Sequence, residues 1–72
     1  MKKEIIGANA GIVWSMLSAK DCKMNFSELL MNTELSPIEL AFAIGWLARE
    51  DKIMFFTEDE KDYIAIFRPS YY

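Results

Sequence analysis

The segment from Leu35 to Ile53 decides the fold, and it reads Leu-Ser-Pro-Ile-Glu-Leu-Ala-Phe-Ala-Ile-Gly-Trp-Leu-Ala-Arg-Glu-Asp-Lys-Ile. Its start is typical of a helix N-terminus. The Ser36 side chain can accept from the N3 amide, Pro37 suits the first helical position, and Glu39 can reach back to the Ser36 amide. We therefore predict a helix over 37–50. Its inward stripe, at helical spacing, is Leu40, Ile44 and Leu47.

A β-hairpin is predicted directly after this helix. Asp51 suits the left-handed position that closes a helix. Two β-rich runs, 52–57 and 63–68, are joined by the acidic segment 58–62, and runs of this kind favour paired strands. Pro69 is expected to end the second strand, because proline cannot donate to a strand ladder.

A long helix is predicted near the start of the chain, over 4–19. Gly7 and Gly11 lie four residues apart in it and leave a small patch where a ring or a backbone could pack closely. We expect a neighbouring core element to fill that patch. The apolar face of this helix is Ile6, Ala10, Val13 and Leu17.

A shorter helix is predicted over 26–33, because Asn25 and Glu28 have the spacing of a capping box. The residues 22–24 before it are expected to form a short strand, with the cysteine half-buried there. Glu34 lies in the turn before the next helix, where glycine is common because the turn often needs positive φ. Either Glu34 is strained at that position or the turn differs slightly.

The order of these elements predicts an α+β fold, namely a winged helix-turn-helix of three helices, a short strand and a C-terminal β-hairpin wing, in one domain over 1–72. The segments 7–14 and 43–53 resemble a family of very short bacterial winged-helix proteins of unknown function. The resemblance implies the fold and shared ancestry with DNA-binding regulators. It implies no catalytic or ligand residues.

The length of the chain limits its stability as a monomer. A chain of 72 residues buries only about 60% of its unfolded surface, although 53% of its residues are hydrophobic, so we expect an extra source of burial. No apolar run approaches the roughly 20 residues that span a bilayer, so no membrane partner is expected. The start lacks the features of a signal peptide. Cys22 is the single cysteine, which favours a reducing, cytoplasmic location.

No catalytic constellation is found in the sequence. The chain has no histidine, and Cys22 therefore has no histidine to activate it. The paired carboxylates lie on a turn and at a helix end, where a solvated role is expected, and the glycines form no phosphate-binding loop. We predict that the protein is not an enzyme and binds no metal or cofactor.

The charge pattern argues against DNA binding by the usual face of a winged helix. Net charge is −3, the basic residues are scattered, and the predicted wing carries an acidic tip. Arg49 is the one basic residue among the outward positions of the helix 37–50, whereas a DNA reader needs several polar or basic side chains there. No DNA-binding residue is therefore predicted.

A protein-protein interface is the function that the apolar surface favours. The helix 37–50 carries a second apolar stripe, and the predicted hairpin is apolar on both faces, which exceeds what a soluble monomer usually exposes. We predict a homodimer. The alternatives are another protein partner, or partial cover of the surface by the tail 71–72 or by an irregular fold. The alternative function is a small transcriptional regulator that contacts DNA through a non-standard face or a partner protein. The predicted interface residues are Ile38, Phe42, Trp46, Met54 and Phe56.

Overall fold

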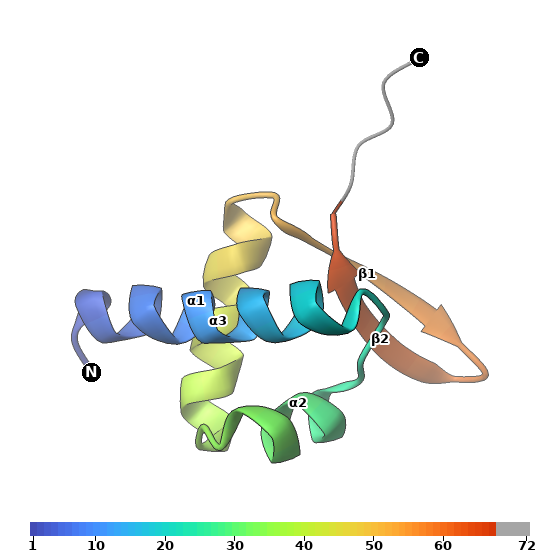
Figure 1. Ribbon diagram of the computed structural model, residues 1–72, viewed down its shortest axis with the longest axis horizontal. Coiled ribbons are helices and arrows are strands. Elements are labelled where there is room, and N and C mark those ends of the chain that lie inside the picture. Colours follow the sequence, from blue (N-terminus) through green and yellow to red (C-terminus); the bar gives the residue numbers. More distant parts are fainter. Residues whose placement is uncertain (68–72) are drawn as a thin grey trace.

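The structure, a computed structural model, describes residues 1–67 as three helices followed by an antiparallel hairpin (Figure 1). This order confirms the predicted α+β winged helix-turn-helix. The second strand was predicted to extend to 68, but it already ends at Ile66, and Pro69 and the tail 71–72 lie outside the described residues. The elements are α1 (Lys3–Lys20), α2 (Phe26–Thr33), α3 (Pro37–Arg49), β1 (Ile53–Glu58) and β2 (Lys61–Ile66).

Capping boxes begin both α2 and α3, as the sequence predicts. The Asn25 side chain accepts from the Glu28 amide at 2.8 Å, and the Asn25 amide donates to the Glu28 carboxylate at 2.9 Å. The Ser36 hydroxyl accepts from the Glu39 amide at 3.2 Å, and the Ser36 amide donates to the Glu39 carboxylate at 2.9 Å. Because each box satisfies amides that a helix start leaves unpaired, it fixes the residue where the helix begins.

Acidic residues occupy the left-handed positions of every turn in residues 1–67. Glu34, between α2 and α3, has φ of 61°, so it adopts the conformation that glycine would otherwise supply. Asp51 has φ of 57° after α3, as predicted. In the hairpin, Asp59 and Glu60 have φ of 50° and 65°, which is the pattern of a two-residue type I′ turn.

The hairpin turn is shorter than predicted. The sequence assigned 52–57 and 63–68 to the strands, whereas β1 and β2 approach the turn more closely and leave only Asp59 and Glu60 between them. Two cross-strand pairs account for the difference. Glu58 pairs with Lys61 in the ladder, and the Thr57 hydroxyl donates to the Asp62 carboxylate at 2.7 Å.

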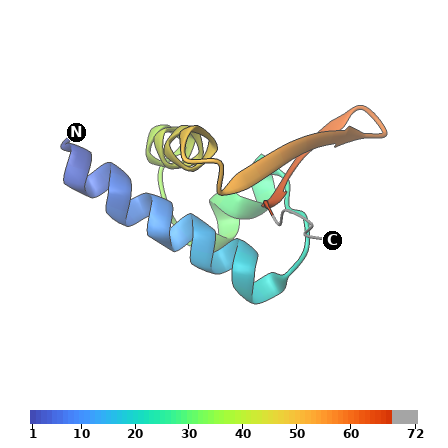
Figure 2. The same ribbon diagram turned by 90° about the horizontal axis from the view of Figure 1, so that it is seen from above.

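The core lies where α1 crosses the inner side of α3, with the hairpin extending from one side of these two layers (Figure 2). All predicted inward residues of α3 are buried, and Ala43 is buried with them. In α1, Ile6 is only half-buried, and Asn9 takes a buried position beside the apolar face. The core residues are Ala10, Val13, Leu17, Met24, Leu29, Leu40, Ala43, Ile44, Leu47, Ile53 and Ile64.

The predicted short strand over 22–24 is reduced to one residue. Met24 forms an isolated antiparallel bridge to Ile64, with backbone hydrogen bonds of 2.9 and 2.8 Å in the two directions. The expectation of a half-buried Cys22 is wrong, because its side chain is exposed beside this bridge. A single bridge is enough to attach the segment between α1 and α2 to the hairpin.

Ser36→Ala should lower the free energy of unfolding by about 1 kcal/mol, because α3 loses the side-chain acceptor of its capping box. Urea denaturation followed by circular dichroism measures the change. Ser15→Ala, at an exposed position in the middle of α1, is the control and should not lower stability. A Ser36→Ala variant that unfolds with the parent would contradict a structural role for the cap.

Glu60→Gly should raise the free energy of unfolding by about 0.5–1 kcal/mol, because glycine adopts a left-handed conformation without the clash of a side chain. Thermal denaturation of the variant beside the parent tests this. The same substitution at Glu4, which lies inside α1, should instead lower stability by about 1 kcal/mol. A loss of stability in Glu60→Gly would show that the Glu60 side chain stabilises the turn by other means.

Candidate functional site

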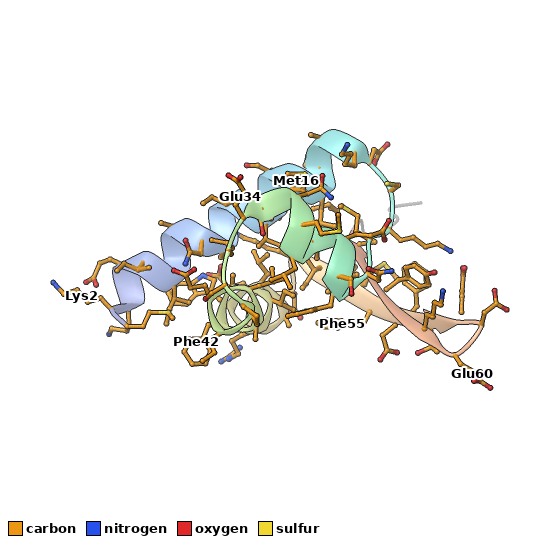
Figure 3. All side chains as sticks on the ribbon, turned by 90° about the horizontal axis from the view of Figure 1, so that it is seen from below. Lys2, Met16, Glu34, Phe42, Phe55 and Glu60 are labelled. Atoms are coloured by element: carbon orange, nitrogen blue, oxygen red, sulfur yellow. The ribbon has the colours of Figure 1, made fainter. Side chains whose placement is uncertain are left out.

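The outer side of α3 is an apolar surface on a helix whose inner side already fills the core. Ile38, Phe42 and Trp46 follow one another at four-residue spacing and are 64%, 50% and 37% exposed. Figure 3 shows Phe42 on the side of α3 that is turned away from α1. Ala41 and Gly45 are exposed on the same side and add no bulk to it. We call these five residues the outer face of α3.

Trp46 closes one edge of the outer face by packing on α1. A Cβ placed on Gly7 would lie 3.6 Å from the Cζ2 atom of the Trp46 ring, so Gly7 leaves room for the ring. Part of the small patch predicted on α1 is therefore filled by this indole. Gly11 is different, because a Cβ there would meet no atom of residues 1–67 within 4 Å.

The hairpin forms the other edge of the outer face. Phe55 is 54% exposed and shares its side of the hairpin with Ile64, its partner in the strand register. A groove of about 520 Å³ separates this side from α3. Because Ala41 lines the groove, the outer face of α3 continues across it to the Phe55 ring. The lining residues are Phe26, Ala41, Ile44, Phe55, Asp62 and Ile64.

Phe56 lies on the opposite side of the hairpin from Phe55, because successive strand residues alternate. Its ring stacks on Tyr63, with centroids 6.1 Å apart. The Lys23 Nζ lies 4.6 Å from the Tyr63 centroid and 5.7 Å from the Phe56 centroid, and it forms an ion pair with Glu58. Lys23 thus lies over the Phe56 ring, which the sequence analysis predicted to share an interface with residues of α3.

The ion pair with Glu58 raises the pKa of the Lys23 amine above its ordinary value, chiefly through the hydrogen bond to the carboxylate. A raised pKa in the folded chain means that the contact stabilises the fold below the ordinary pKa of the amine. This contribution disappears as the pH rises through the raised value. Both side chains are exposed, so the pair positions the hairpin more than it stabilises the domain.

The structure therefore brings together some of the predicted interface residues and separates others. Ile38, Phe42 and Trp46 share the outer face, whereas Met54, which is 45% exposed, alternates with Phe55 and lies on the Phe56 side of the hairpin. Phe55, which shares the groove with α3, was not among the predicted interface residues. The alternating pattern shows that a strand has two apolar faces, but it does not show which face is turned towards α3.

Charge is unevenly distributed around the apolar surface. Glu60 lies at the far end of the hairpin (Figure 3), in an acidic tip over 58–62 where Lys61 is the one basic residue. Arg49 is the one basic residue of α3. Within residues 1–67, no three His, Cys, Asp or Glu side chains gather closely enough to hold a metal ion. No helix in the same part of the chain has the length and apolarity to cross a membrane.

Three helices, a capped third helix and a two-stranded hairpin define a winged helix-turn-helix domain. Comparison with known families agrees: the chain belongs to the winged helix-turn-helix domain family DUF2582, whose profile matches residues 1–66. A curated relative is the uncharacterized protein MJ1608 of Methanocaldococcus jannaschii. It is 34% identical over 62 residues, which cover 85% of this chain and 89% of the relative.

Two solved structures share the fold. The solution NMR structure of protein BT2368 from Bacteroides thetaiotaomicron is 37% identical, with a TM-score of 0.79 over 92% of this chain and 79% of that one. A structure from work on the DNA recognition and protein interaction domains of HOP2 has a TM-score of 0.73. It covers 82% of this chain and 98% of that one, at 19% identity. The likeness to HOP2 concerns the fold alone.

Proposed function

We propose that the protein is a non-enzymatic interaction module that self-associates through the outer face of α3 and the adjoining hairpin edge. One observation carries this proposal: Ile38, Phe42 and Trp46 remain exposed on a helix that is fully used on its inner side. Exposed rings of this kind are enriched at interfaces, where they bury large areas with little loss of conformational entropy. We propose a cytoplasmic location, because a single cysteine is typical of a reducing compartment.

The size of the surface suits an interface between two proteins. Phe, Tyr and Trp each offer about 150–250 Å² for burial, and the rings of Phe42 and Phe55 are about half exposed. With Ile38 and Trp46 they supply roughly 400 Å², which is about half of the 800 Å² that each partner buries in a standard interface. The rim of the groove provides further area.

The monomer also has a weakness that association would offset. A domain of 72 residues has little stability to lose. Self-pairing is the simplest remedy, because two-fold dimers are the commonest assemblies and couple stability to protein concentration.

Phe42→Glu should convert a dimer into a monomer at micromolar concentration, because the carboxylate would be buried without a partner at the interface. Phe42 is half exposed in the single chain, so the variant should keep its fold. Sedimentation equilibrium measures the mass, and circular dichroism confirms the helices.

Met31→Glu is the matched control. Met31 is 81% exposed, but it lies on α2, away from the outer face of α3, so this variant should remain a dimer. If the parent sediments as an 8.3 kDa monomer, self-association is wrong. In that case the outer face would have to serve another protein partner.

Sequence-specific DNA binding is the second candidate, and the fold shared with HOP2 favours it. The surface does not. Non-specific affinity for DNA comes from several clustered Lys or Arg, whereas α3 offers Arg49 alone. A hairpin with an acidic tip would also approach phosphates unfavourably. A regulatory role is compatible with these charges if the protein contacts DNA through a partner protein or through another face.

We expect negligible binding to duplex DNA at about 100 mM salt. Fluorescence anisotropy with labelled random and genomic duplexes tests this expectation. A micromolar or tighter complex whose affinity falls steeply with added salt would favour the regulator over the interaction module. A basic variant in which Asp59 and Glu60 are replaced by lysine is a useful control, because it should gain weak, salt-sensitive affinity.

A further inference from the structure

We propose that two copies pair through antiparallel α3 helices centred between Ala43 and Ile44, so that each Phe42 ring is seated over the partner's Gly45. This arrangement rests on the proposed self-association and specifies its geometry. The second copy completes the site, because the Phe42 ring of one chain fills the space above the helix of the other.

The first argument is the open space above Gly45. A Cβ there would meet nothing within 4 Å among residues 1–67, so no contact in this part of the chain requires a glycine. Glycine is an unfavourable residue inside a helix. At Gly7, by contrast, the Trp46 ring lies close enough to explain the small residue. A ring of a second copy that packs over Gly45 would require a small residue there, just as the Trp46 ring does at Gly7.

The second argument is the order of large and small residues along the outer face. In an antiparallel pair centred between Ala43 and Ile44, Phe42 lies level with the partner's Gly45, and Ile38 lies level with the partner's Arg49. All four lie near the middle of the outer side, given 3.6 residues per turn. Small residues at such a contact allow two helix axes to approach to about 8 Å, the lower end of the usual range.

The third argument is charge. Arg49 is at the C-terminal end of α3 and Glu39 is in its first turn. An antiparallel pair places the Arg49 stem over the partner's Ile38 and its guanidinium near the partner's Glu39. A parallel pair would instead place Arg49 beside the partner's Arg49 and the Phe42 ring against the partner's Phe42 ring. Charge and volume therefore both favour the antiparallel direction.

The hairpin edge adds to this contact. Phe55 lies across the groove from Ala41, on the same side of α3 as the proposed contact. A partner helix over Gly45 would therefore be flanked by Phe55 and would shield part of its ring from water. Trp46 limits the contact at the other edge, where it is held against Gly7 of its own chain.

Sedimentation velocity on a dilution series of the full chain, with Gly45→Leu and Gly11→Leu, tests the arrangement. Gly45→Leu should raise the dimer dissociation constant at least tenfold, because leucine would occupy the place of the partner's Phe42. Its thermal midpoint at dilutions where both chains are monomers should not fall, since the position is open and leucine favours a helix. Gly11→Leu, at an equally open helical glycine on α1, should dimerise like the parent.

The outcomes separate this geometry from self-association itself. A monomeric parent would overturn both. A dimeric parent whose dissociation constant is unchanged or lowered in Gly45→Leu would overturn the antiparallel packing and leave self-association in place. Arg49→Glu provides a second reading: an antiparallel dimer should weaken, because two carboxylates would meet, whereas a parallel dimer would exchange one like-charged pair for another.

Discussion

The packing of α1 across the inner side of α3 is the contact on which the rest of the structure depends. Ala10 and Val13 from α1 are buried with Leu40 and Ala43 from α3, and the small alanines allow the two helices to lie close together. This contact uses the whole inner side of α3. The outer side is left without a covering layer within residues 1–67, because α2 and the hairpin lie beside α3 and not over it. The exposed apolar surface is thus a direct consequence of how few elements the chain has.

Much of the fold was predictable because local signals and the hydrophobic pattern agree. Ser36 and Asn25 fix the starts of two helices through contacts within four residues, and such contacts can be recognised from spacing alone. The turns were harder to predict. Glu34 and Glu60 adopt left-handed conformations although glutamate rarely does so, whereas glycine, asparagine and aspartate are the residue types that mark such positions. The short hairpin turn and the conformation of Glu34 therefore emerged only from the structure.

The candidate site was predictable in part, for a physical reason that differs between helix and strand. The stripe of Ile38, Phe42 and Trp46 follows from helical periodicity, because a helix with one buried face must expose the other. The sequence of a hairpin that is apolar on both faces does not show which face is exposed. The core contact of Ile53 and Ile64 decides that Phe55 lies on the side of the groove, whereas Phe56 lies on the other face, under Lys23. That contact joins residues far apart in the sequence, and no local pattern encodes it.

Function follows from the surface of this fold more than from the fold itself. A winged helix that reads DNA uses the outer side of its third helix to present polar and basic groups, and here the same side presents Phe42, Trp46 and a glycine. Aromatic rings in place of charged groups change which partners the surface can bind. Phosphates would meet the single positive charge of Arg49 on this helix, whereas another apolar surface gains from the release of water. A second copy offers a surface that matches in both size and polarity, and it is present wherever the protein itself is present. The helix that makes the domain a winged helix-turn-helix is therefore also the element on which the proposed self-association rests.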